Sequence, residues 1–124
     1  DMLPLFWTNN LAVARLLREK TIDINHRSRN GGNVFHGTGL RRRPAELVRF
    51  FIAEGADVNV TDNFGDTPLL LACHNYESFE ALLDEGAIVT DRVIGSLRYA
   101  GDVVGNEESV RIMHLLRRRG LIEM

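Results

Sequence analysis

The chain has 124 residues, of which 44% are hydrophobic and 26% are charged, a composition typical of one globular domain. Its 15 basic and 17 acidic side chains leave a net charge of −2, which argues against attraction of the whole chain to nucleic acid or to an anionic membrane. The single cysteine, Cys73, excludes an intrachain disulfide and a zinc site built on cysteines. No apolar run approaches the roughly 20 residues that span a bilayer, and the first residues lack the pattern of a signal peptide.

One segment recurs along the chain. Its four copies, the last of them shortened, are residues 16–25, 50–59, 81–90 and 115–120. Asn25 and Asn59 hold the same place in two copies and lie 34 positions apart. A period of about 33 residues with two short helices per unit is typical of a repeat architecture. We therefore expect one domain over residues 1–124, with atypical units at both ends, divided at about 1–25, 26–59, 60–90 and 91–124.

The first unit is partial, and the second has an uneven pattern. One predicted helix of the first unit has its apolar positions at Leu11, Val13, Leu16 and Leu17. In the second unit, Gly37 and Gly39 lower the propensity of the first helix, so we expect this unit to be a weak link. The second helix of that unit carries an apolar stripe made of Leu47, Val48, Phe51 and Ile52.

The third unit has the clearest helix signals. Thr67 can cap a helix, and Pro68 suits the first helical position, where its missing N–H costs nothing. Leu69 and Ala72 are three positions apart and share a helix face. The three glycines that follow predicted helices stand where a left-handed residue ends a helix, and they are Gly55, Gly86 and Gly120.

The fourth unit has lost these signals in part. We expect Leu97 and Ala100 to take the places of Leu69 and Ala72, and residues 102–106 to form an elongated connection. Acidic side chains favour the start of a helix and basic ones its end, because they complement the helix dipole. Glu107 and Glu108 therefore predict where the last helix begins, and the arginines at 117–119 predict where it ends.

Residues 62–73 read D-N-F-G-D-T-P-L-L-L-A-C, which resembles the ankyrin repeat signature D-x-x-G-x-T-P-L-H-x-A-A, with Leu70 in place of its histidine. Residues 28–39 are a more divergent copy that keeps His36. The resemblance implies an all-α ankyrin-repeat solenoid of about three to four helix-turn-helix units with short β-hairpin-like loops. It also implies that His36 braces the backbone of the turns and that Cys73, at an alanine position, is a small buried filler.

The same resemblance implies a module that binds another protein through its hairpin loops and inner helix face, as an adaptor, an inhibitor or a targeting domain. The positions that correspond to this face are Arg27, Arg29, Asn30, Leu40, Arg41, Thr61, Asn63, Phe64, Asp66, His74 and Asn75. Taken singly, each is equally compatible with a solvated turn residue. Phe64 is the strongest candidate for an anchor, because a large aromatic side chain at a loop tip has no core to join.

Two asparagines are candidate modification sites. The resemblance to ankyrin repeats implies modification by asparaginyl hydroxylase at the asparagine of the Asp-Val-Asn turn, which corresponds to Asn25 after Asp23-Ile24 and to Asn59 after Asp57-Val58. Leu17 stands eight positions before Asn25, as the resemblance requires, whereas Phe51 takes that place before Asn59. The interpretation applies only in a eukaryotic host.

The sequence offers no pattern for catalysis, for a cofactor or for a metal ion. The four histidines lack metal-ligand spacing, Gly31-Gly32 is followed by neither Lys-Ser nor Lys-Thr, and no G-x-S-x-G motif occurs. We therefore expect a protein that is not an enzyme and needs no cofactor. We also expect it to be monomeric by itself and to work in the cytoplasm or nucleus.

Two alternatives stay open. The chain could be the substrate-recruiting part of a larger enzyme, or of a microbial effector that acts inside a host cell, since a start at Asp1 leads us to expect a longer natural protein. The other alternative is binding of nucleic acid by the arginines at 41–43 and 117–119. It is disfavoured because aromatic platforms and groove-reading motifs are lacking, and runs of charge usually solvate a surface.

Overall fold

The computed structural model describes residues 8, 10–20, 23–36 and 44–122. Within these ranges the chain forms six α-helices and one π-helical segment, with no strand. In chain order they are α1 (Leu11–Arg18), α2 (Ala45–Ala53), α3 (Pro68–Leu71), α4 (Tyr76–Asp84), α5 (Asp91–Arg98), η3 (Tyr99–Val103) and α6 (Glu107–Arg118). None of these helices is long and apolar enough to cross a membrane.

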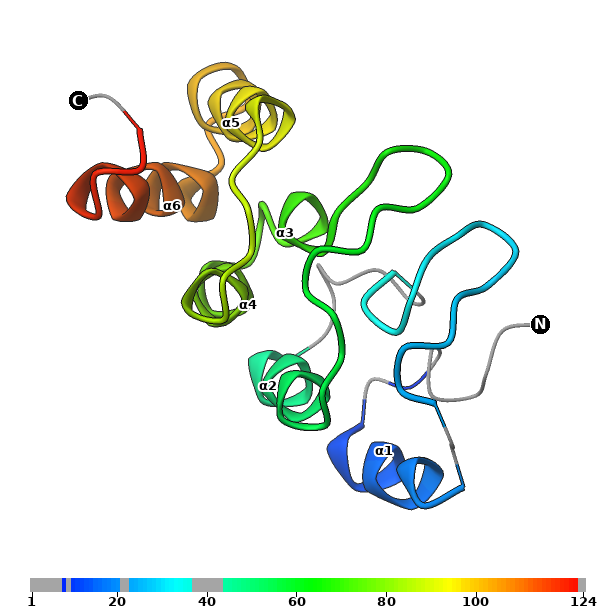
Figure 1. Cartoon of the computed structure of the whole chain (residues 1–124). Helices are drawn as coiled ribbons and strands as arrows, with labels where there is room; N and C mark the ends of the chain where they lie inside the picture. The colour runs from blue at the N-terminus through cyan, green and yellow to red at the C-terminus, as the bar shows by residue number, and fades with distance from the viewer. Residues whose placement is uncertain (1–7, 9, 21–22, 37–43, 123–124) are drawn as a thin grey trace.

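The helices stand in two layers of a solenoid (Figure 1). α1, α2, α4 and α6 form an outer row in which each contacts the next, and α3 and α5 contact each other in an inner layer. The loops at residues 27–32 and 61–66 project side by side from the inner layer, away from the outer row. This arrangement confirms the predicted all-α solenoid with hairpin-like loops.

The helix ends follow the chemistry of single residues. Thr67 accepts a hydrogen bond from the N–H of Leu70, and Pro68 occupies the first turn, as predicted. Side chains of the same kind start the other capped helices, and these are Asn10, Asn75, Thr90 and Asn106. Gly55 and Gly86 have φ angles of 92° and 97°, values that only glycine adopts without strain, so α2 and α4 end where predicted.

The core runs as one cluster between the two layers and through successive units. Its largest fully buried side chains are Phe35, Phe51, Phe79, Leu47, Leu69, Leu82, Leu97 and Ile112. The rings of Phe35 and Phe51 meet edge to face with centroids 6.0 Å apart. Cys73 is buried, as predicted for a filler, and Leu97 and Ala100 are buried like Leu69 and Ala72. Stacking thus covers the apolar stripe of each unit with that of its neighbour.

Two predicted segments, the connection at residues 102–106 and the first helix of the second unit, differ from the structure. The connection predicted at residues 102–106 is shorter, because η3 prolongs α5 to Val103 and the N–H of Val104 bonds to the carbonyl of Tyr99. The first helix predicted for the second unit lies partly outside the described residues. What is described of it, residues 34–36, is a turn rather than a helix.

Candidate protein-binding face

Asn25 connects the first unit to the second, and Asn59 connects the second unit to the third. The amide nitrogen Nδ2 of Asn25 donates to the carbonyl of Gly55 (3.1 Å), and its Oδ1 accepts from the N–H of Asp57 (2.7 Å). Asn59 repeats this pattern one unit later, with the carbonyl of Gly86 (3.2 Å) and the N–H of Ile88 (2.9 Å). Both candidate hydroxylation sites therefore use their side-chain amides to hold the spacing between units.

The two loops that project from the inner layer, residues 27–32 and 61–66, form what we call the hairpin face. Each loop closes on itself, because the N–H of Ser28 bonds to the carbonyl of Gly32 (2.9 Å) and the N–H of Asp62 to that of Asp66 (3.1 Å). Such closure fixes the shape of a loop before any partner arrives.

The two loops are also bonded to each other. The N–H of Asn63 donates to the carbonyl of Asn30 (2.7 Å), and its Nδ2 donates to that of Arg29 (3.0 Å). The guanidinium of Arg27 donates to the carbonyl of Gly31 and to that of Thr61, both at 2.8 Å. Arg27 and Asn63, both predicted to contact a partner, thus shape the hairpin face.

Arg92 of α5 holds the tip of the second loop from the next unit. Its guanidinium lies 3.1 Å from the carboxylate of Asp66 and donates to the carbonyl of Phe64 at 3.0 Å. The side chain of Phe64 is 70% exposed on this fixed backbone. The role of Arg92 could not be recognised from the sequence, because its position at the start of a helix carries no local signal of a contact 28 residues away.

His36 supports the hairpin face through hydrogen bonds to the backbone of both units. Its Nδ1 accepts from the N–H of Asn33 (3.0 Å), and its Nε2 donates to the carbonyl of Asp66 (2.9 Å). The two bonds are compatible with the neutral tautomer that carries its proton on Nε2. The bracing role implied by the resemblance is therefore present, across two units.

The remaining predicted positions do not join this face. Asn75 is half-buried and caps α4 through the N–H of Ser78 (3.2 Å). His74 is half-buried too, with its Nδ1 3.5 Å from the Oγ of Ser109 in α6. Both side chains are engaged at the α3–α4 turn. Leu40 and Arg41 lie outside the described residues.

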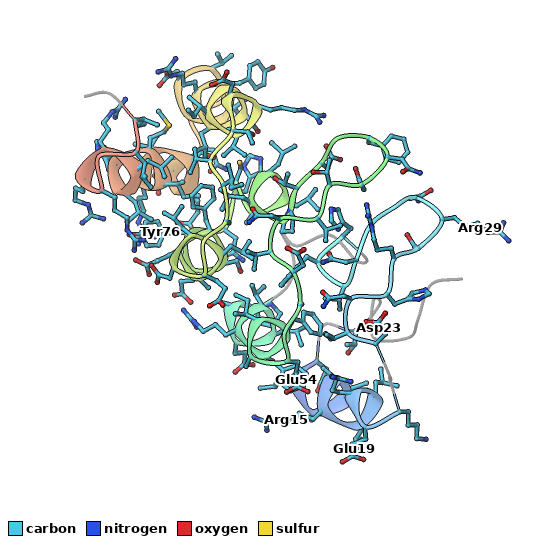
Figure 2. The ribbon with its side chains drawn as sticks, in the orientation of Figure 1. Arg15, Glu19, Asp23, Arg29, Glu54 and Tyr76 are labelled. Atoms are coloured by element: carbon cyan, nitrogen blue, oxygen red, sulfur yellow. The ribbon has the colours of Figure 1, made fainter. Side chains whose placement is uncertain are left out.

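The side chains at the loop tips that point outward include Arg29, which extends away from the outer row (Figure 2). Asn30, Asn63 and Phe64 are exposed around it. Among the described residues, no group of three or more His, Cys, Asp or Glu side chains is placed to hold a metal ion. The face thus combines one exposed aromatic ring with polar groups on a preformed backbone.

A family model of ankyrin repeats in three copies matches residues 35–114. The chain belongs to the ankyrin repeat family. Members of this family are generally protein–protein interaction modules and typically are not catalytic. The ankyrin repeat protein FPV230 of Fowlpox virus (strain NVSL) is 34% identical over 62 residues, which cover 50% of this chain and 32% of the viral protein.

The fold of this ankyrin repeat chain is also found among solved structures. The crystal structure of the human ASB11 ankyrin repeat domain superposes with a TM-score of 0.75 and 22% sequence identity, over 90% of this chain and 53% of the human one. The likeness extends to the fold alone. The chain spans 32% of the viral relative and 53% of the human domain.

Proposed function

We propose that this ankyrin repeat chain holds a partner protein on its hairpin face, with Phe64 as the central anchor. The observation that carries the proposal is that the backbone of Phe64 is fixed by hydrogen bonds while its ring is exposed to solvent. Its N–H bonds to the Oδ1 of Asp62 (2.9 Å) and its carbonyl is held by Arg92, whereas its ring is 70% exposed. An aromatic ring fixed in solvent contributes binding energy at little cost in ordering.

The polar groups around Phe64 support a specific contact. Arg29, Asn30 and Asn63 surround the loop tips, and polar side chains around a central aromatic group are typical of protein interfaces. Asn63 and Arg27 already bond to the backbone of the neighbouring loop. We therefore expect them to act on affinity through the shape of the face, and Arg29 and Phe64 to act by direct contact.

The experiment uses the purified chain as bait in a lysate of its own host, with captured proteins identified by mass spectrometry. The test variant is Phe64→Ala with Arg29→Ala. The matched control is Leu16→Ala with Arg15→Ala, because Leu16 is 63% exposed on α1 and Arg15 is exposed beside it. Loss of a captured protein with the test variant only would support the proposal. Equal capture by both variants would overturn it.

A second proposal is that the chain is the recruiting part of a longer protein. The share of the matched proteins that the chain spans, 32% and 53%, supports it. The bound protein would then be presented to a neighbouring domain, and the viral relative makes action inside a host cell one form of this proposal. Determination of the full reading frame tests it. A frame that encodes no further domain would exclude it.

A further inference from the structure

The outer row of helices carries a second surface feature, opposite the hairpin face. Between α4 and α6 lies a hollow of about 810 Å³, lined by Tyr76, Arg111, His114, Arg117 and Arg118. In Figure 2, Tyr76 and Arg29 mark the two sides of the molecule. Three guanidinium groups and one imidazole line this hollow. We call it the basic hollow. The carboxylate of Glu108 adjoins it, where it pairs with Arg111 and accepts from the N–H of Tyr76 (3.2 Å), so the guanidinium groups still outnumber the carboxylate.

Tyr76 holds two of these arginines in place. The guanidinium carbon of Arg111 lies 4.3 Å from the centroid of the Tyr76 ring, a cation–π contact. The Nη2 of Arg118 donates to the hydroxyl of Tyr76 at 3.2 Å. Glu108 holds the other side of Arg111 through an ion pair of 2.7 Å. The basic hollow is therefore preorganised, which lowers the entropic cost of binding a ligand.

The helix dipole accounts for Arg117 and Arg118, which lie in the last turn of α6, but not for Arg111. Only side chains in the last turn complement the negative end of the dipole, and Arg111 is in the first half of α6. Arg119, which does follow the last turn, pairs with Asp84 (2.7 Å) and Glu80 (3.7 Å).

The length of the basic row points to an extended ligand. Arg111, His114 and Arg118 follow one another at i, i+3 and i+7, so they lie on one face of α6. Seven residues of helix rise about 10 Å at 1.5 Å per residue. A peptide in extended conformation covers this length with about three residues at 3.3 Å each. A single phosphate group is too small to reach both ends of the row.

Nucleic acid fits the basic hollow less well than a peptide does. Single strands stack their bases on exposed aromatic faces. The aromatic groups in the described lining are the ring of Tyr76 and the imidazole of His114, and the guanidinium of Arg111 already covers one face of Tyr76. We propose that the basic hollow between α4 and α6 binds an extended segment of a partner protein that is rich in Glu or Asp.

Fluorescence anisotropy tests this proposal with a fluorescein-labelled peptide of six glutamates flanked by glycines. Wild-type protein should bind it saturably at low salt and lose affinity as salt rises. The double variant Arg111→Gln, Arg118→Gln should bind at least about tenfold more weakly, since it removes two charge-assisted contacts. The matched control, Arg15→Gln with Arg98→Gln, removes the same charge from exposed positions elsewhere and should keep wild-type affinity.

Three outcomes would overturn the proposal. These are no saturable binding, equal losses in the two double variants, and tighter binding of a labelled oligouridine or of inorganic phosphate than of the peptide. Should the hollow variant fail to fold, amide chemical shifts of the wild-type protein decide. Peptide-induced changes confined to α4 and α6 support the proposal, whereas changes spread over other helices contradict it. The hairpin face is tested independently, because Phe64→Ala should leave peptide binding unchanged.

Discussion

The Nε2 of His36 lies 2.9 Å from the carbonyl oxygen of Asp66, thirty positions further along the chain. This bond joins the turn of the second unit to the loop that presents Phe64. Because the Nδ1 of the same ring accepts from the backbone of Asn33, one side chain connects two backbone segments. His36 therefore couples the stability of the second unit to the geometry of the hairpin face.

Replacement of His36 by Ala should lower the free energy of unfolding by about 1–3 kcal/mol, because it leaves partly buried backbone groups without their partners. Urea denaturation followed by circular dichroism measures this. His114→Ala is the matched control, since His114 is exposed on α6 and should change stability by about 0.5 kcal/mol or less. Equal effects of the two substitutions would contradict the bracing role.

The spacing of the second and third units should depend on Asn59. Asn59→Ala removes a bond to the carbonyl of Gly86 and one from the N–H of Ile88, so we expect a loss of about 1–2 kcal/mol. Asn59→Asp keeps the acceptor for Ile88 and loses only the donor, so its loss should be smaller at neutral pH. Thermal unfolding of the two variants under the same conditions shows which of them is less stable. The reverse order would show that the retained acceptor for Ile88 contributes less than the repulsion between the new carboxylate and the carbonyl of Gly86.

Two glycines should respond to alanine with opposite signs. A Cβ atom on Gly32 would lie 2.7 Å from the Cβ of His36, so Gly32→Ala should displace that ring and destabilise the protein by about 1–3 kcal/mol. Gly95 lies within α5 with nothing within 4 Å of an added Cβ. Gly95→Ala should therefore stabilise by about 0.5–1 kcal/mol. Urea denaturation of both variants tests the pair. Similar effects at the two sites would argue against steric contact with His36.

The second unit should open more readily than the third. Among the described residues, the amides of Phe35 and His36 bond to Asn33, within a single turn, and Gly37 follows in the sequence. Those of Leu71 and Ala72 bond to the carbonyls of Thr67 and Pro68 within a helix that Thr67 caps. Hydrogen exchange should therefore be about tenfold faster at Phe35 and His36. Equal protection of the two pairs of amides would show that stacking makes the two units equally stable.

Hydroxylation of Asn25 and Asn59 stays a prediction. If the chain is produced in a eukaryotic host, intact-mass analysis should show an added oxygen, and peptide mapping should place it on Asn25 before Asn59, because Leu17 stands eight positions before Asn25. An unmodified mass from such a host would exclude the modification. Protein made in a bacterial host serves as the unmodified reference.

Features that depend on a few neighbouring residues could be predicted from the sequence. Thr67 and Pro68 start α3 where expected, Gly86 ends α4, and Leu97 and Ala100 are buried. The prolongation of α5 as η3 was missed, because a π-helical turn is stabilised by backbone bonds such as the one between Val104 and Tyr99 rather than by a side-chain signal. The boundaries of the units stay a prediction.

The residues of the candidate sites also divide into those that the sequence could predict and those that it could not. The outward position of Phe64 and the bracing role of His36 could be predicted, because both follow from a place in the repeated motif. The cap formed by Asn75 could have been recognised, since Ser78 follows it at the spacing of a capping residue. The spacing of Arg111, His114 and Arg118 was also visible in the sequence. Their position beside Tyr76 of α4 was not, because it depends on how α6 packs against α4.

By itself, the sequence determined the start of α3, the ends of α2 and α4, the repeat period and the family, because capping, glycine φ angles and apolar spacing act over a few residues. Only the tertiary structure decided which side chains meet across units. Arg92 reaches Phe64 over 28 positions, and Arg118 reaches Tyr76 over 42. Those contacts depend on the distance and angle at which one unit stacks on the next. Packing of the whole core sets both, so no single segment encodes them.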